Sequence, residues 1–446
     1  MQLEDLATTV LQQARQLGAT AGDVLVASGE SFSAGVRFGE VEKVQNAREK
    51  RMGLRLFVGH RSAITSTANF TREAVEDLVA ETVALAKATA ADEFSGLPAA
   101  GDLARDFPDL DLADSPPDLT AEKQIALARE AEAAALGADP RLTNSEGAEF
   151  SSGSREVLYA NSSGFIGRYH TTSYSLSVVP VASENGAMQR DYWYSAHRKL
   201  HKLEPAAAVG KKAAERTVRR LGARRVRTQE APVVFDPETA ASLLRHLAGA
   251  VSGSALYRKT SFLLGKLGEK IAAAGVWIDD DGRIPSALGS KPFDGEGLPT
   301  CRTPVVADGV LTSYLLDTYS ARKLGLRSTG SASRSFADVP AAGPTNFFLR
   351  PGAASPGEII RSVRSGLYVT ELSGFGVNPV TGDYSRGAVG LWIENGELAY
   401  PVEEITIAGN LLEMFQNIET VGNDLQLRGS IAAPTVKITR MTIAGE

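Results

Sequence analysis

Residues Leu243–Ser261 read LLRHLAGAVSGSALYRKTS, and this stretch indicates more about the fold than any other part of the chain. Asp236 lies upstream of it and is a residue type that accepts hydrogen bonds from the first backbone N–H groups of a helix. Before Asp236 comes a short apolar run, residues 233–235, that is typical of a buried strand. The sequence therefore predicts a strand that leads directly into a helix, followed by a glycine- and serine-rich turn.

The expected helix lacks the side chains of a zinc-dependent peptidase. Thermolysin-like helices carry two His residues one turn apart with a Glu between them, which gives two ligands and a general base on one face. The chain contains five His residues, and none lies in a His-Glu-x-x-His pattern. His246 lies in the quoted stretch, but no Glu follows it there. We therefore expect His246 to pack on its helix or to be exposed from it.

The overall composition is that of an ordinary soluble protein, because 43% of the 446 residues are hydrophobic, 22% are charged and the net charge is -6. This acidic balance argues against nucleic-acid binding, since a phosphate-binding surface needs an excess of basic side chains. One segment, residues 211–227, is dense in Lys and Arg. It is interpreted as the solvated end of a helix, with a polyanion or partner surface as the alternative.

Cysteine content and the N-terminus bear on the compartment. Cys301 is the single cysteine, so it can form no intramolecular disulfide and no cysteine-based zinc site. The chain begins MQLEDLATTVLQQARQLG, which is an amphipathic helix pattern and not a signal peptide. No apolar run in the sequence approaches the roughly 20 residues that a membrane-spanning helix needs. These features predict a cytoplasmic protein with no membrane partner.

The order of the expected helices and strands divides the chain into four parts. Residues 1–92 and 120–227 each show a helix, a β-meander and a second helix, which suggests a duplicated architecture. Residues 93–119 form an acidic, proline-rich linker, and residues 228–446 are rich in glycine and in strand-like runs. We expect an α+β fold in which two helix–β-meander–helix units precede a mainly antiparallel, strand-rich C-terminal domain.

Local signals in the C-terminal part predict turns and one helix end. Asp308-Gly309 and Asn395-Gly396 are residue pairs that favour the tight turns of β-hairpins. Residues 279–282 (DDDG) lack the spaced ligands and the terminal Glu of a calcium loop and are interpreted as a charged turn. Residues 272–275 are expected to end a helix.

The quoted stretch resembles the active-site helix of the TldD/PmbA metallopeptidase family, whose members are also called modulators of DNA gyrase. Residues 258–261 (RKTS) and 250–251 (AV) match the motif of that family. The most specific further match is residues 368–396, YVTELSGFGVNPVTGDYSRGAVGLWIENG, and the resemblance covers essentially the whole chain. The catalytic branch carries His-Glu-x-x-x-His, and at those ligand positions this chain has Ala248, Gly249 and Gly253. The chain therefore resembles the non-catalytic PmbA (TldE) branch.

The resemblance implies a role. Active members are expected to use a cysteine near the C-terminus as a zinc ligand, and residues 424–434 here contain no Cys. The resemblance thus implies a chain that holds no metal and is inactive alone. It implies a heterodimer with a TldD-like subunit, which carries zinc and cleaves unfolded peptides or peptide precursors while this chain helps to enclose and position the substrate. A homodimer is the alternative when the chain is produced alone.

Two segments are the candidates for peptide contacts. Strand addition captures an extended peptide through main-chain hydrogen bonds without strong sequence preference. The candidate residues are Arg258 and Lys259 after the helix, and Gly374 and Gly376 in a glycine-rich turn.

Two other classes of function stay open. A self-sufficient hydrolase would need a nucleophile and a base, but Ser252 and Ser254 do not lie in a Gly-x-Ser-x-Gly elbow. His197 and His201 have the spacing of two metal ligands on a helix, although the basic residues between them disfavour a cation. A stand-alone binding or scaffold protein, such as a gyrase modulator, would bind gyrase or DNA and no zinc-bearing paralogue.

Overall fold

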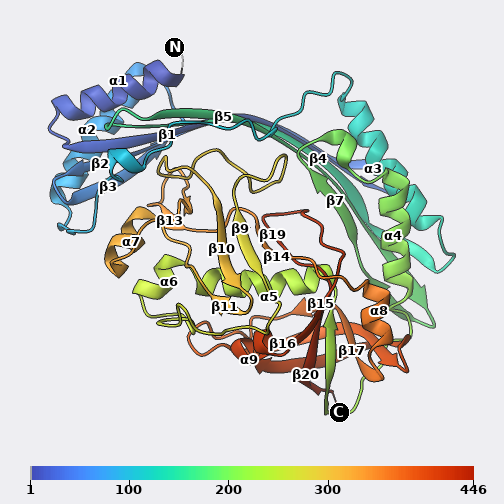
Figure 1. Ribbon diagram of the computed structural model, residues 1–446. Coiled ribbons are helices and arrows are strands. Elements are labelled where there is room, and N and C mark those ends of the chain that lie inside the picture. Colours follow the sequence, from blue (N-terminus) through green and yellow to red (C-terminus); the bar gives the residue numbers. More distant parts are fainter. Residues whose placement is uncertain (1–2, 446) are drawn as a thin grey trace.

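The computed structural model describes residues 3–445, which form a long curved sheet arching over a C-terminal half (Figure 1). The helices are α1 (Leu3–Gln16), α2 (Arg72–Ala88), α3 (Ala121–Leu136), α4 (Ala206–Val218), α5 (Pro237–Ala250), α6 (Gly253–Tyr257), α7 (Thr318–Leu324), α8 (Pro356–Arg361) and α9 (Leu411–Gln416). The strands before residue 200 are β1 (Ala21–Arg37), β2 (Glu40–Val58), β3 (Arg61–Thr67), β4 (Leu142–Asn161), β5 (Ile166–Glu184), β6 (Ala187–Arg190) and β7 (Trp193–His197). The later strands are β8 (Gln229–Phe235), β9 (Ile278–Asp281), β10 (Arg302–Ala307), β11 (Val310–Leu311), β12 (Ala332–Ser333), β13 (Ala341–Ala342), β14 (Phe347–Leu349), β15 (Ser365–Ser373), β16 (Asp383–Glu394), β17 (Glu397–Asn410), β18 (Ile418–Val421), β19 (Ile431–Ala432) and β20 (Val436–Ala444).

The expected α+β class is confirmed, and the C-terminal half is strand-rich and mainly antiparallel. Among its pairings, β8 with β15 and β14 with β19 are parallel. None of the helices within residues 3–445 combines the length and the apolar character needed to cross a membrane.

The strands of both N-terminal units belong to one sheet, here called the long sheet. Its order is β3-β2-β1-β4-β5-β6, and β7 also pairs with β5. β1 and β4 are antiparallel neighbours, with a register that runs from Asp23 opposite Asn161 to Val36 opposite Ala148. The helix–meander–helix order is present in each unit, and the two meanders are joined edge to edge through β1 and β4.

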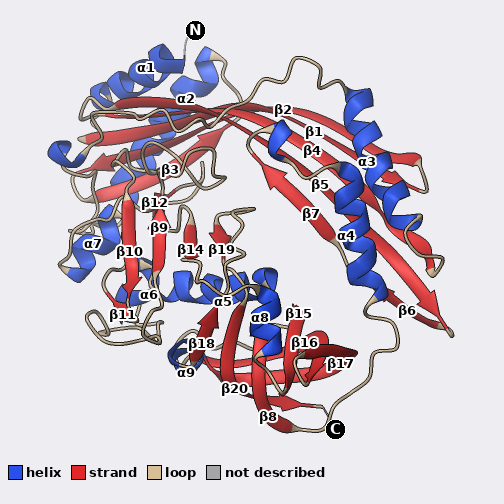
Figure 2. Cartoon of the chain, turned by 45° about the vertical axis from the view of Figure 1, so that its right-hand side comes forward, coloured by secondary structure: helices blue, strands red, loops and turns tan. Residues whose placement is uncertain are grey.

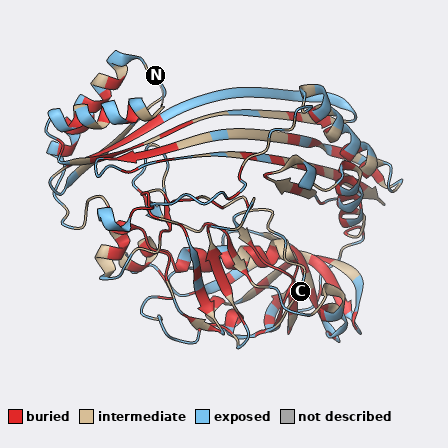
Figure 3. Cartoon of the chain, turned by 45° about the horizontal axis from the view of Figure 1, so that its top comes forward, coloured by how far each residue is buried: buried red, intermediate tan, exposed pale blue. Residues whose placement is uncertain are grey.

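Two helix pairs cover one face of the long sheet at its two ends (Figure 2). Val24 and Val26 of β1 pack with α1 and α2, whereas Val36 of the same strand packs with α3 and α4. These positions are an even number of residues apart, so their side chains point to the same face. Between the helix pairs the strands are more exposed, and the first part of β2 is exposed throughout (Figure 3).

The opposite face of the long sheet is joined to the C-terminal half by buried charges and aromatic rings. Asp23 is fully buried and pairs with both Arg55 and Arg334. Arg55 also lies 3.3 Å from the carboxylate of Glu296 in the C-terminal half. The Phe165 ring packs on Phe293, with 5.3 Å between centroids. Because buried ion pairs are costly to break, this contact fixes how the sheet sits on the C-terminal half.

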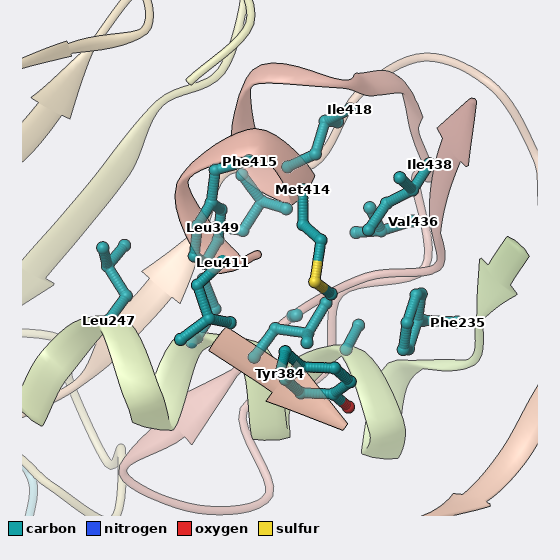
Figure 4. Close-up of a cluster of buried hydrophobic side chains, with 14 of the residues drawn as sticks. Phe235, Leu247, Leu349, Tyr384, Leu411, Met414, Phe415, Ile418, Val436 and Ile438 are labelled. Atoms are coloured by element: carbon teal, nitrogen blue, oxygen red, sulfur yellow. The ribbon is translucent and has the colours of Figure 1, made fainter. Parts of the chain in front are cut away.

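The quoted stretch folds as predicted, with β8 leading into α5. Asp236 is the N-cap of α5 and accepts a hydrogen bond from the backbone N–H of Thr239. The helix lies between two sheets, with orders β11-β10-β9-β14-β19 and β17-β16-β15-β8-β20-β18. Its Leu247 side chain enters the same hydrophobic core as Tyr384 and Met414 (Figure 4). Packing on both sides therefore holds α5 rigidly in place.

Three sequence predictions differ from the structure, two of them only in part. Residues 272–275 are not helical, and Gly275 has a φ of 81°. Of residues 279–282, interpreted as a charged turn, residues 279–281 belong to strand β9, with Asp279 buried and paired to Arg302 and Arg350, and the turn begins at Gly282. The basic segment is only partly solvated, since Arg216 and Arg220 are buried and paired with Asp191. Asp279 and Asp191 are each buried beside arginines that are distant in sequence, and these arginines offset the cost of burying the carboxylate charge.

Candidate functional site

The positions that the resemblance assigns to the two ligands and the general base of the family motif lie where α5 ends and α6 begins. Ala248 is buried and Gly249 is exposed, both in the last turn of α5, and Gly253 is the first residue of α6. The helix stops at Val251, whose carbonyl accepts a hydrogen bond from the Leu315 backbone N–H at 3.0 Å. The Gly253 N–H in turn donates to the Leu315 carbonyl at 2.8 Å. The break between the two helices is thus held by a neighbouring strand-like segment.

Gly253 has no room for a side chain. An ideal Cβ there would lie 2.2 Å from Ser320 Oγ, 2.5 Å from Ser320 Cβ and 3.0 Å from Leu316 Cδ2. Ser320 cannot easily move away, because its backbone and hydroxyl form a capping box with Asp317 at the start of α7. The position that would carry a His ligand is therefore filled by α7.

The residues present do not fit a zinc ion. Alanine and glycine side chains have no donor atoms, and among residues 3–445 no group of three or more His, Cys, Asp or Glu side chains could hold a metal. Residues 424–434 are where active members are expected to carry a cysteine ligand. The carboxylate in this segment, Asp424, is already engaged, since it accepts hydrogen bonds from the N–H and the hydroxyl of Thr435 at 2.9 and 2.7 Å.

A serine–histidine pair is not assembled either. The His246 ring packs edge-on against Tyr384 at 6.3 Å between centroids, and burial, followed by Arg386 and Arg245, lowers the pKa of His246. The Ser252 hydroxyl donates instead to the Ala342 carbonyl at 3.0 Å and lies 3.1 Å from Ser254 Oγ. Within the described part of the chain, neither serine has a hydrogen bond to His246.

The spaced pair His197 and His201 does not share a helical face. His197 ends β7, and His201 lies in a short 3₁₀ turn, Leu200–Lys202. The Nδ1 atom of His197 accepts a hydrogen bond from the Lys199 backbone N–H at 3.0 Å, which uses one ring nitrogen. In the described structure, this pair therefore lacks the helical spacing that would bring the two rings together around a metal ion.

The four candidate peptide-contact residues lie in two exposed segments that touch. Arg258 caps the end of α6, and Lys259 adopts a left-handed conformation with φ 57°. Gly374 and Gly376 lie between β15 and β16, and the segments are linked by a hydrogen bond from Phe262 N–H to the Pro379 carbonyl at 2.9 Å. Peptide binding at these residues stays a prediction.

A cavity of about 590 Å³ borders the first turns of α5, and the sequence patterns did not indicate it. Glu238, Ala241 and Arg245 line it from α5, and they share a helical face with Gly249 because the spacing is three or four residues. The other walls come from residues 192–194, from α4 and Arg219 after it, from Tyr368 of β15, and from residues 426–433. The one sequence feature that could have pointed to this cavity is the high content of Lys and Arg in residues 211–227, because Arg216 and Arg219 line it.

Comparison with known proteins identifies the family. Three family models match in order: PmbA/TldA metallopeptidase domain 1 over residues 22–86, the central domain over residues 114–221 and the C-terminal domain over residues 228–445. The chain belongs to the PmbA/TldD metallopeptidase family. Among PmbA relatives, metalloprotease PmbA of Escherichia coli O157:H7 is 40% identical over 445 residues, which cover 100% of this chain and 96% of that protein.

Other relatives of this PmbA/TldD-family chain carry the TldD name. A metalloprotease TldD homolog of Haemophilus influenzae is 27% identical, over 73% of each chain. A crystal structure of a protein described as a modulator of DNA gyrase, from Bacteroides thetaiotaomicron, superposes with a TM-score of 0.92 at 31% identity over 99% of both chains. TldE of Thermococcus kodakarensis has the same fold, with a TM-score of 0.87 at 22% identity over 98% of this chain and 99% of that one.

Proposed function

We propose that this PmbA/TldD-family protein is the non-catalytic subunit of a zinc metallopeptidase complex that cleaves unfolded peptides or peptide precursors. The observation that carries the proposal is the packing at Gly253, where Ser320 occupies the space that a ligand side chain would need. Together with Ala248 and Gly249, this makes the helix a preserved scaffold without catalytic groups. A TldD-like partner with an intact His-Glu-x-x-x-His helix supplies the zinc and the general base.

The role of this chain in the complex is to enclose the substrate and hold it extended beside the partner's active site. Arg258, Lys259, Gly374 and Gly376 are the proposed contacts, and their exposure leaves them free to meet a peptide. Relatives of this chain carry both the PmbA and the TldD name, so the two proposed subunits share a fold and pair through related surfaces. A cytoplasmic location is part of the same proposal.

The test is native mass spectrometry of the tagged chain isolated from its own host. We expect a 1:1 complex with a zinc-containing paralogue, and peptide cleavage by that complex that a chelator abolishes. The same chain produced alone is the control, and we expect it to form a homodimer without peptidase activity. Chelator-resistant cleavage by the isolated chain would overturn the proposal, as would recovery of only a homodimer, or of a gyrase complex, from the host.

A further inference from the structure

The first part of strand β2 has one free edge. β1 pairs with β2 from Glu40 to Phe57, whereas β3 pairs with it only from Met52 onward. On the β3 side, residues 40–51 therefore have no neighbouring strand among the described residues 3–445. Every one of these residues is exposed, so helices and loops leave this side uncovered (Figure 3). Residues 40–51 are called the β2 edge below.

An edge of this kind is a template for another strand. Its unpaired N–H and C=O groups can be completed by main-chain hydrogen bonds from a second extended segment. Charged side chains on an edge deter indiscriminate pairing, and the β2 edge reads EVEKVQNAREKR, with charges of both signs. A strand that pairs with it must therefore carry charges that match this pattern.

The β2 edge has its midpoint at Asn46. Residues 35 and 36 of β1 lie opposite Lys43 and Val41, so Glu42 is an extra residue in a β-bulge and shares one position with Val41. With that pair counted as one, the positions before Asn46 (40, 41–42, 43, 44 and 45) equal in number those after it (47 to 51). Two copies of the edge can therefore pair antiparallel about Asn46 along their whole length.

In this symmetric pairing, charged residues face residues of opposite charge. The facing pairs are Glu40 with Arg51 of the second copy, Glu42 with Lys50, and Lys43 with Glu49. Each pair occurs twice, because the two-fold axis at Asn46 relates one copy to the other. Opposite charges that lie directly across from each other stabilise a pair of strands. The β2 edge is thus complementary to itself.

The charges also select this register over its neighbours. A shift of the axis by one residue in one direction places Glu40 opposite Glu49. The same shift in the other direction places Lys43 opposite Arg51. Like charges directly opposite each other destabilise strand pairing. Only the axis at Asn46 avoids both clashes, so it is the register that the charges favour among the three.

We propose that two copies of this chain join edge to edge through residues 40–51 of β2, antiparallel, with the two-fold axis at Asn46. The two long sheets then become one continuous sheet, and the free edge is removed. This inference goes beyond the proposed function, which includes a homodimer of the chain produced alone but assigns no surface to it.

A cysteine placed on the axis tests the geometry directly. In the full chain with Cys301→Ser, Asn46→Cys sets two thiols opposite each other, where Cα atoms lie about 4.5–5.5 Å apart and a disulfide can form. Lys43→Cys is the matched control, because it is equally exposed on the same strand but lies about 20 Å along the strand from its copy. With oxidised glutathione, we expect a disulfide-linked dimer on a non-reducing gel for Asn46→Cys and little for Lys43→Cys. Equal cross-linking of the two variants would overturn the register.

A charge exchange tests the contact without cross-linking. Lys43→Glu sets two carboxylates against each other in both symmetric pairs, and is expected to weaken the dimer about 10- to 100-fold in sedimentation equilibrium. Adding Glu49→Lys reverses each pair and is expected to restore the affinity of the unmodified chain. Lys270→Glu makes the same charge change at an exposed position in the C-terminal half and should leave the dimer unaffected.

Two results would overturn the proposal. One is an unmodified chain that stays monomeric at micromolar concentration, and the other is equal affinity of the Lys43→Glu and Lys270→Glu variants. Failure of the double variant to recover would show that Lys43 and Glu49 do not face each other. All of these measurements use the chain produced alone, so their failure is distinct from failure of the proposed complex with a zinc-bearing subunit.

Discussion

The Arg216 guanidinium on α4 donates a hydrogen bond to the Asp236 carboxylate, 3.2 Å away, and so joins the central helices to the cap of α5. Both side chains are almost fully buried, with 6% and 2% exposure. Burial raises the pKa of Asp236, and Arg216 opposes that shift. One carboxylate therefore starts α5 and fixes it to the preceding part of the chain.

Removing the arginine is expected to destabilise the protein strongly. Arg216→Met leaves Asp191 and Asp236 buried without their shared cation, which costs about 3–5 kcal/mol of unfolding free energy. Arg225→Met is the control, because the Arg225–Glu404 pair is exposed and such pairs contribute less than about 1 kcal/mol. Urea unfolding measures both. Similar losses for the two variants would show that burial does not govern these ion pairs.

The glycines of the vacant motif are expected to respond oppositely to alanine. Gly253→Ala places a Cβ against Ser320 and should destabilise by about 1–3 kcal/mol. Gly249→Ala meets nothing within 4 Å and lies within α5, so it should stabilise by about 0.4–1 kcal/mol. Thermal and urea unfolding of the two variants provide the comparison. A neutral Gly253→Ala variant would contradict the packing argument.

The triple change Ala248→His, Gly249→Glu and Gly253→His is expected not to create a zinc site. The third change overlaps Ser320, and a further ligand and its supporting hydrogen bonds are still missing from residues 424–434. Zinc content is measured by elemental analysis after dialysis, with the unmodified chain as the control. Stoichiometric zinc in the triple variant would refute the prediction.

Asp280 is expected to make stability fall as pH rises. Burial raises its pKa to about 6, although the Thr345 N–H and hydroxyl and Lys291 oppose the shift. The folded state then holds a proton that the unfolded chain has lost, so this contribution is complete below about pH 4 and disappears as pH passes about 6. A shift of this size corresponds to roughly 3 kcal/mol.

The pH effect is isolated by comparing Asp280→Asn with the unmodified chain. Asparagine cannot ionise but keeps an acceptor for the Thr345 N–H, which lies 2.7 Å from Oδ1. The stability of the variant relative to the unmodified chain should therefore increase between about pH 4 and pH 7. Asp139→Asn is the control, because its pKa of about 2 places any change below that window. A flat difference for Asp280→Asn would contradict the assignment.

Lys259 allows function to be separated from stability. Its φ of 57° favours glycine, so Lys259→Gly should be neutral or stabilise by up to about 1 kcal/mol. If the cation contacts substrate, the same variant should raise the KM of the assembled complex several-fold, and Lys259→Arg should not. An unchanged KM would remove Lys259 from the peptide contacts.

Local signals explain which parts of the fold could be predicted. The prediction that β8 leads directly into α5 was correct, because Asp236 caps the helix that follows it. The hairpin at Asp308-Gly309 was correct because Asp308 and Gly309 both adopt positive φ, at 50° and 81°. Strand β9 was missed because its buried Asp279 is balanced by Arg350, 71 residues away. Such pairing leaves no trace in local sequence patterns.

The same distinction applies to the site. Ala248, Gly249 and Gly253 could be singled out from sequence, because the resemblance shows which side chains of the motif are missing there. The overlap with Ser320 was not, since it depends on how α6 meets α7. The cavity was missed because a basic segment was interpreted as solvated, whereas Arg219 is turned inward at the end of α4. Counting charges does not reveal which of them are buried.

The shared long sheet has a consequence for synthesis. β1 is made early, but its second neighbour, β4, is complete only at Asn161. Until then the edge of β1 from Asp23 to Val36 is unpaired, and such edges invite association with other chains. A chain that stops near residue 92 is therefore expected to aggregate, even though it contains every element of the first unit. The nascent protein depends on its second unit, or on a chaperone, to protect its first.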